Sequence, residues 1–341
     1  MEEIAVPEET NRQWTLASRP DGFPKESDFS LVDTPIPAPQ HEEVLVKVEY
    51  LSLDPYMRGR MNDGKSYAAG VPIGGVMQGE SVGRVIESKS GSIAVGDHVT
   101  VRSGWQEYAV AHSTAVRRVD ASVAPISTSL GVLGMPGLTA YFGTLEVLAP
   151  KAGDTFVVSA ASGAVGGVVG QIAKVNGCRV IGTAGSDEKT SYIVAELGFD
   201  AAINYKTENV AERLRELCPD GIDCYFDNVG GETTDAVLDN LAFGARIAIC
   251  GQISQYNASG PVMGPRNLRA LLVARAKMQG FLVSDFSIKF PQARARLTKW
   301  VQDGSIKFKE DVVDGFEEMP RAFIGMLHGA NFGKLLIRAN G

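Results

Sequence analysis

The sequence predicts an α/β protein of two domains, one rich in β-strands and one built on a parallel sheet. With 341 residues, 44% of them hydrophobic and 21% charged, the chain is long enough to form two hydrophobic cores. Up to about residue 130, strand signals predominate, and Gly and Pro separate them. Beyond residue 155, short apolar runs alternate with helical segments, which is the order that a parallel sheet requires.

The first, β-rich part contains four stretches that we interpret as strands. They are residues 44–51, 79–87, 98–101 and 106–111. Together they predict an antiparallel, barrel-like domain with a polar connection between Asp54 and Gly75. A helical stretch over residues 133–148 follows, so we expect the domain boundary near Gly134.

The second part is organised around the stretch from Thr155 to Lys174. A short apolar strand is followed there by a loop of small residues and then by apolar residues at helical spacing. Gly163 and Gly166 are thus expected at the start of a helix, where unpaired N–H groups and the helix dipole can bind a pyrophosphate. The pattern A-x-x-G-x-x-G is weak by itself. An apolar run over residues 178–183 completes a β-α-β unit, which supports a dinucleotide site.

The end of the second strand of this unit distinguishes NAD from NADP. In dinucleotide folds an acidic residue about 20 positions after the glycine turn holds the ribose hydroxyls of NAD, whereas nearby cations suit the 2′-phosphate of NADP. Here Thr183-Ala-Gly-Ser186 contains no acid, Lys189 lies just beyond it, and Tyr205 follows the next strand. We therefore predict NADP(H) as the cofactor. Two alternatives stay open: Asp187 or Glu188 turns back to the ribose, or the unit binds no ligand.

The rest of the chain continues the alternation of helices and strands. Predicted helices are residues 187–197, 210–217, 233–241 and 292–301, and predicted strands are residues 201–205, 222–226, 245–250, 277–284 and 331–338. We expect the last strand to rejoin the sheet of the first domain. Because ligands gather at the carboxyl ends of parallel strands, the loops at Asn228 and from Gly251 to Tyr256 are expected to face the cofactor.

Composition and charge argue against several other classes of protein. The net charge of −7 disfavours a nucleic-acid partner. The first ten residues are acidic and lack the features of a signal peptide, and the sequence has no apolar span of the length, about 18 residues, that a membrane helix needs. We therefore expect a cytoplasmic protein without membrane contact.

The cysteines and histidines do not form a metal-binding pattern. The cysteines are Cys178, Cys218, Cys224 and Cys250, and the histidines are His41, His98, His112 and His328. There is no C-x-x-C pair, and the histidines are dispersed, whereas a catalytic zinc needs three convergent ligands. We predict no metal site and no disulfide framework.

Six motifs, in order along nearly the whole chain, resemble those of one enzyme superfamily. They are LSLDPYMRGR (51–60), GMPGLTAY (134–141), ASGAVG (161–166), FDNVGG (226–231), CGQISQYN (250–257) and GANFGK (329–334). With the predicted order of domains, they resemble the medium-chain dehydrogenase/reductase superfamily. Within it, they are similar to the zinc-free branch of prostaglandin reductases (leukotriene B4 12-hydroxydehydrogenases), alkenal double-bond reductases and bacterial curcumin reductase.

The resemblance implies a fold, a reaction and a set of cofactor contacts. The fold is a Rossmann NADP-binding domain over residues 134–303, with a β-rich, GroES-like substrate domain formed by residues 1–133 and 304–341. The reaction is NADPH-dependent reduction of the C=C bond of a small enone or enal. The implied cofactor contacts are Gly163, Ala164, Val165 and Gly166 with the diphosphate, Lys189 and Tyr205 with the 2′-phosphate, and Asn228, Cys250, Gly251, Ile253, Ser254, Tyr256, Phe281, Leu282, Val283 and Asn331.

Two tyrosines are candidates for the chemistry. Without a metal, the enolate oxygen that develops during hydride addition needs a neutral hydrogen-bond donor, and tyrosine is protonated at pH 7. Tyr256 is the first candidate, either as donor to that oxygen or by fixing the nicotinamide ribose hydroxyl that donates; the alternative is a packing aromatic. Tyr56 is the second candidate, with a structural role in its turn as the alternative. We expect water to supply the proton to the α-carbon.

Two other functions stay open at this point. One is a quinone reductase of the same superfamily, and the other is an NADPH-binding protein without catalytic activity. The analogy with the superfamily also predicts a homodimer, in which the edge strand Gly280–Ser284 continues one sheet into the next.

Overall fold

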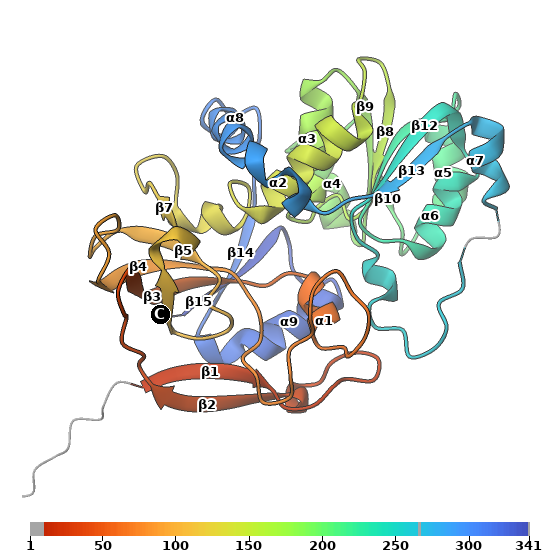
Figure 1. Ribbon diagram of the computed structural model, residues 1–341. Helices are drawn as coiled ribbons and strands as arrows, with labels where there is room; N and C mark the ends of the chain where they lie inside the picture. Colours follow the sequence, from red (N-terminus) through yellow and green to blue (C-terminus); the bar gives the residue numbers. More distant parts are fainter. Residues whose placement is uncertain (1–9, 265–266, 340–341) are drawn as a thin grey trace, which may run out of the picture. The chain divides into compact units, whose positions relative to one another are not determined.

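The computed structural model describes residues 10–264 and 267–339 (Figure 1). The acidic residues 1–9, on which part of the signal-peptide argument depends, lie outside the described residues, as do residues 340–341 of the predicted substrate domain. The chain forms two compact units. The first unit comprises the chain up to Leu130, Val312–Ile324 and the residues from Leu336 on, and the second unit comprises Gly131–Asp311 and Gly325–Leu335.

The first unit is built on a seven-stranded sheet with the order β14-β15-β3-β4-β5-β7, and β6 also pairs with β3. Its strands are β3 (Glu43–Ser52), β4 (Ser81–Ser88), β5 (His98–Val101), β6 (Tyr108–His112), β7 (Arg117–Val119), β14 (Glu310–Asp314) and β15 (Lys334–Arg338). A separate antiparallel hairpin joins β1 (Thr10–Leu16) to β2 (Phe29–Pro35). Trp105 is fully buried between Phe29 and Phe323, with ring centroids 5.5 Å from each.

The C-terminal strand returns to this sheet, as predicted. β15 pairs antiparallel with β3, and Leu336 lies opposite Ser52. Leu336 is completely buried, in an apolar cluster with Val82 and Leu130. Burial of these apolar side chains explains why the last strand stays in the sheet.

The second unit contains a six-stranded parallel sheet with the order β10-β9-β8-β11-β12-β13. The strands are β8 (Thr155–Val158), β9 (Arg179–Ala184), β10 (Ala201–Asn204), β11 (Ile222–Asp227), β12 (Leu241–Ile249) and β13 (Lys277–Gly280). They alternate with α3 (Gly166–Val175), α4 (Asp187–Ala195), α5 (Val210–Leu217) and α6 (Gly231–Leu238). The other main helices are α2 (Met135–Phe142), α7 (Arg269–Ala274) and α8 (Phe290–Gln302). The predicted parallel α/β arrangement is confirmed.

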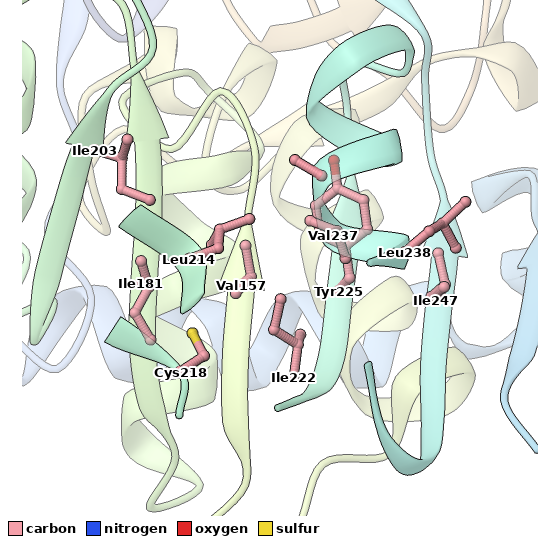
Figure 2. Close-up of a cluster of buried hydrophobic side chains, with 11 residues drawn as sticks. Val157, Ile181, Ile203, Leu214, Cys218, Ile222, Tyr225, Val237, Leu238 and Ile247 are labelled. Atoms are coloured by element: carbon pink, nitrogen blue, oxygen red, sulfur yellow. The ribbon is translucent and has the colours of Figure 1, made fainter. Parts of the chain in front are cut away.

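The core of this unit lies between the sheet and the helices that cross over it. Figure 2 shows Val157, Ile181, Tyr225 and Ile247 on adjacent strands, with Leu214 of α5 and other helical side chains against them. From β8 the chain adds strands outward through β9 to β10, and from β11 it adds them outward on the other side. The sheet therefore reverses its strand order between β8 and β11, and ligands of such sheets bind at that point.

Two local predictions were wrong. The predicted strand 277–284 ends at Gly280, because the carboxylate of Asp285 accepts the N–H of Leu282 and starts a 3-10 helix, Val283–Lys289. The connection predicted to be polar contains helix α1 (Tyr56–Arg60), and Met57 within this helix and Met61 directly after it are completely buried. Strand β5, in contrast, has the predicted bounds and begins at His98, whose ring lies 3.3 Å from Glu49.

The division into units differs from the predicted domains near the C-terminus. Residues 304–311 and 325–335 lie in the second unit, whereas the prediction assigned all of 304–341 to the first domain. Gln171 of α3 explains part of this difference, because its amide donates to Lys307 O (2.8 Å) and accepts from Lys307 N (2.7 Å). Phe332 N likewise donates to the Asp311 carboxylate at 3.0 Å.

A close contact inside the second unit predicts a stability effect. A Cβ at Gly170 in α3 would lie 1.9 Å from Cζ of the buried Phe199. We expect Gly170→Ala to lower the free energy of unfolding by about 1–3 kcal/mol, because the core cannot take an added methyl group there without shifting. Urea unfolding measures this. Gly59→Ala is the control, since a Cβ there meets nothing within 4 Å, and an equal loss in both variants would contradict the packing argument.

Candidate functional site

The glycine turn between β8 and α3 fits a phosphate group. Ala160 adopts a left-handed conformation (φ 51°), and a Cβ at Gly166 would lie 2.4 Å from its carbonyl oxygen. Only glycine therefore allows the chain to turn so sharply into α3. The first N–H groups of a helix have no partner inside it and carry the positive end of the helix dipole. The structure thus brings Gly163, Ala164, Val165 and Gly166 together at the start of α3, and the N–H of Gly163 donates to Ala160 O at 3.0 Å.

Asn228 connects the loop after β11 to the glycine turn. Its side chain donates to Ser159 O (2.8 Å), and its backbone N–H donates to Ser159 Oγ (2.9 Å). Ser159 follows β8 directly, so these bonds join the two loops across the reversal of strand order. Sequence analysis identified Asn228 but not Ser159, since a contact between strands far apart in the chain leaves no local pattern.

The side chain of Asp227 holds this loop in place, and sequence analysis did not identify it as a site residue. Its carboxylate is completely buried and accepts hydrogen bonds from Tyr225 OH (2.9 Å), Thr234 Oγ1 (2.6 Å) and the N–H groups of Val229 (2.9 Å) and Gly230 (2.8 Å). Burial, and then the nearby Asp227, raise the pKa of Tyr225 well above its ordinary value, so this phenol stays a donor. The FDNVGG motif contained the signal, because a buried acid at a strand end needs donors in the following loop.

The loop after β12 positions Tyr256. Gln252 N donates to the Tyr256 hydroxyl at 3.3 Å, and this oxygen lies 3.1 Å from the place of a Cβ at Gly251. The phenol is thereby held against the carboxyl end of β12. Two hydrogen bonds join this loop to the loop after β11. The Ser254 hydroxyl donates to Val229 O at 2.6 Å, and Ile253 N donates to Asn228 O at 3.3 Å.

Cys250 begins this loop but has no nucleophilic character. Its N–H donates to Asp227 O at 2.9 Å, which ties β12 to β11. Burial, and then the charge of Asp227, raise the pKa of the Cys250 thiol to about 12. The thiol is therefore protonated at neutral pH, and its predicted role as a contact residue involves no thiolate.

Lys189 and Tyr205 lie at the carboxyl ends of the neighbouring strands β9 and β10. Ser186 caps α4 and accepts the N–H of Lys189, whose ammonium donates to Gly329 O at 2.8 Å. The Tyr205 hydroxyl lies 2.7 Å from the place of a Cβ at Gly185, so the phenol packs on the backbone after β9.

Lys206 is a further cation at this end of the sheet that sequence analysis missed. Burial, and then the positive charge of Lys206, lower the pKa of Lys189. Lys206 directly follows Tyr205, just after the end of β10. Two lysines and a phenol that follow adjacent strands are suitable groups to bind a phosphate monoester.

The remaining predicted contacts lie in two other segments of the second unit. Phe281 packs edge-on against Phe226 of β11, with ring centroids 6.1 Å apart, and Leu282 and Val283 follow it into the 3-10 helix. Asn331 donates its side-chain amide to Gly333 O at 2.9 Å. The next residues, Gly333 and Lys334, line a small cavity together with residues 162–164 of the glycine turn.

Tyr56 lies in the first unit, at the start of α1. Burial raises its pKa well above the ordinary value, and the negative charges of Asp54 and Glu80 raise it further. The guanidinium of Arg60 lies 5.7 Å from the Tyr56 ring centroid and 4.3 Å from that of Tyr67. Tyr56 is thus a protonated phenol at neutral pH, as a hydrogen-bond donor requires.

Comparison with known proteins identifies the family. A family profile described as the N-terminal domain of oxidoreductase matches residues 12–119, and one described as zinc-binding dehydrogenase matches residues 164–299. The NADPH-dependent curcumin reductase of Escherichia coli is 45% identical over 97% of this chain and 97% of its own. Rat prostaglandin reductase 1 is 44% identical over 96% of this chain and 99% of its own. The crystal structure of CurA from Vibrio vulnificus in complex with NADPH is 47% identical, with a TM-score of 0.92 over 97% of this chain and 99% of that one.

The chain belongs to the prostaglandin reductase, alkenal reductase and curcumin reductase branch of the medium-chain dehydrogenase/reductase superfamily.

The two-domain fold predicted for a member of this superfamily is confirmed. Among residues 10–264 and 267–339, no group of three His, Cys, Asp or Glu side chains is placed to hold a metal ion. Within the same ranges, no helix has the length and apolar character needed to span a bilayer.

The glycine turn of this reductase predicts a binding defect. We expect Gly166→Ala to weaken NADPH binding by about tenfold or more, because the added Cβ would collide with Ala160 O and displace the N–H groups that are predicted to bind the diphosphate. Titration of NADPH fluorescence measures the dissociation constant. Gly64→Ala, where a Cβ meets nothing within 4 Å, is the control. Unchanged affinity in Gly166→Ala would place the cofactor elsewhere.

Proposed function

We propose that this protein reduces the C=C bond of α,β-unsaturated ketones and aldehydes with NADPH. The observation that carries the proposal is the group of loops at the reversal of strand order, where the glycine turn, Asn228 and Tyr256 are joined by hydrogen bonds. Lys189, Tyr205 and Lys206 at the ends of β9 and β10 support NADP(H) over NAD(H). The relatives named curcumin reductase and prostaglandin reductase 1 support the same reaction class.

The proposed chemistry needs a binding surface and a neutral hydrogen-bond donor. Bound NADPH supplies a hydride to the β-carbon of the substrate, and negative charge then develops on the carbonyl oxygen. Backbone N–H groups of the glycine turn would hold the diphosphate, and Lys189, Tyr205 and Lys206 would hold the 2′-phosphate. Cys250, Gly251, Ile253 and Ser254 would contact the nicotinamide half, and Phe281, Leu282, Val283 and Asn331 would complete the contacts.

We assign the donor role to Tyr256. Gln252 N–H donates to its oxygen, and a hydroxyl that accepts such a bond becomes a stronger donor. The phenol either donates to the enolate oxygen or fixes the nicotinamide ribose hydroxyl that does so. Tyr56 is the second donor that we propose, since its raised pKa keeps the phenol neutral. Water supplies the proton to the α-carbon.

The reaction can be tested with a simple enone. We expect 3-nonen-2-one and NADPH to give the saturated ketone. The decrease in NADPH absorbance measures the rate, and identification of the product shows which bond is reduced. Tyr256→Phe is expected to lower kcat by about 10- to 1000-fold, since one donor to a developing oxyanion contributes on that order. The dissociation constant of NADPH distinguishes the two roles of Tyr256: it stays within about twofold if the phenol donates to the enolate oxygen, and it rises by more if the phenol fixes the ribose hydroxyl.

Three outcomes would contradict the proposal. An allylic alcohol as product would place the hydride on the carbonyl carbon. Faster turnover of quinones than of every enone would favour a quinone reductase. Tight NADPH binding without hydride transfer to any acceptor would indicate a non-catalytic binding protein.

We also propose a homodimer formed through the edge of the parallel sheet. β13 is the last strand of the sheet, and all four of its residues are exposed. Met278 on this strand and Leu282 just after it are more than a third exposed, and Ile288 in the following 3-10 helix is 96% exposed. An exposed edge flanked by apolar side chains can pair with the same edge of a second copy across a two-fold axis. The cytoplasmic location stays a prediction.

The proposed dimer can be tested by its mass in solution and by substitutions at the edge of the sheet. Light scattering is expected to give twice the chain mass of 36.4 kDa. Met278→Lys with Ile288→Lys is expected to give the monomer, because charges at an edge strand oppose pairing. Val95→Lys is the control, since this side chain is 62% exposed and belongs to the first unit. A monomer for the unaltered chain would refute the dimer without affecting the proposed reaction.

A further inference from the structure

One buried amide lies where the adenosine end of the cofactor is expected. Asn204 is the last residue of β10 and lies opposite Ala184, the last residue of β9. Its side chain is 4% exposed. The amide nitrogen donates to Asp187 Oδ1 at 2.7 Å, and the amide oxygen accepts from Lys206 N at 3.1 Å. The Asn204 side chain is therefore bonded to the carboxylate of Asp187 and to the backbone N–H of Lys206.

Asp187 is the acid that matters for the choice of cofactor. It is the first carboxylate after β9, and folds that bind NAD use an acid in this region to accept the ribose hydroxyls. A 2′-phosphate carries a charge of about −1.5 to −2 at pH 7, so a free carboxylate beside it would oppose binding. In this structure, the neutral amide of Asn204 occupies one oxygen of that carboxylate.

The amide oxygen of Asn204 holds the turn that contains Tyr205 and Lys206. The bond from Lys206 N to Asn204 Oδ1 fixes the backbone just after Tyr205, and Tyr205 N donates to Ala184 O at 3.1 Å. Glu208 accepts the N–H of Asn204 at 2.7 Å, which holds the same turn. Lys206 thus has a fixed backbone position directly after Tyr205.

We propose that Asn204 sets the preference of this chain for a nucleotide with a 2′-phosphate, by holding Asp187 away from the adenosine ribose and by positioning the Tyr205-Lys206 turn. Asn204 is thus a positioning residue that acts through Asp187 and Lys206. The inference rests on the proposed NADPH-dependent function and goes beyond it, because it names the residue that excludes NADH.

The test is a double-mutant cycle on cofactor binding. Dissociation constants of NADPH and NADH are measured by fluorescence titration for the unaltered chain, Asn204→Ala, Asp187→Ala and the double variant. We expect Asn204→Ala to reduce the NADPH-over-NADH preference by roughly five- to tenfold, since the released carboxylate repels the phosphate and accepts from the ribose hydroxyl. Asp187→Ala alone is expected to change the preference by less than about twofold, and the double variant to recover most of it.

Each other outcome would overturn the inference. If Asn204→Ala weakens both nucleotides equally, or if Asp187→Ala does not restore the preference, Asn204 has only a structural role. Should Asn204→Ala not fold, as judged by its melting curve, Asn204→Ser with the same Asp187→Ala partner serves instead. Failure of the proposed function is distinct, because the unaltered chain would then bind neither nucleotide or bind NADPH without reducing an enone.

Discussion

The buried carboxylate of Asp227 is the group on which the carboxyl edge of the parallel sheet depends. A charge that is fully removed from water is tolerated only when donors surround it, and here the loop after β11 provides two backbone N–H groups while Tyr225 and Thr234 provide hydroxyls. The conformation of that loop is therefore a requirement of the core. The loop conformation fixes the position of Asn228. It also fixes the loop that contains Tyr256, because that loop is hydrogen-bonded to Asn228 and Val229.

The proposed cofactor contacts of the second unit follow the ends of several strands. The turn after β8 offers backbone groups, which suit a diphosphate that every nicotinamide nucleotide contains. The segments after β9 and β10 carry the side chains that we propose to distinguish NADPH from NADH, and the loop after β12 carries the phenol assigned to the chemistry. These parts lie together because the sheet is parallel and reverses its strand order at one place.

Sequence reasoning predicted most elements of the second unit and the motif-bearing residues of the site. β8, β9 and α5 follow from apolar periodicity, and α5 was predicted with the bounds that it has, Val210–Leu217. The end of β13 was not predictable from periodicity, because a side chain to backbone bond from Asp285 ends it. Ser159 and Asn204 were missed for a related reason: they bond to Asn228 and Asp187, which follow other strands, and no spacing in the chain encodes those contacts. Asp227 was missed although the FDNVGG motif contained a local signal, and Lys206 belongs to no motif.

The return of β15 to β3 has a consequence for how the chain is made. The Tyr50–Arg338 and Ser52–Leu336 pairs join segments that precede and follow the whole parallel sheet in the chain. On the ribosome, most strands of the first unit are synthesised early, but its sheet cannot be completed until β15 has left the exit tunnel, after the whole parallel sheet. During that interval the Tyr50–Ser52 end of β3 lacks its partner, so the nascent protein presents an open strand edge of the kind that chaperones shield.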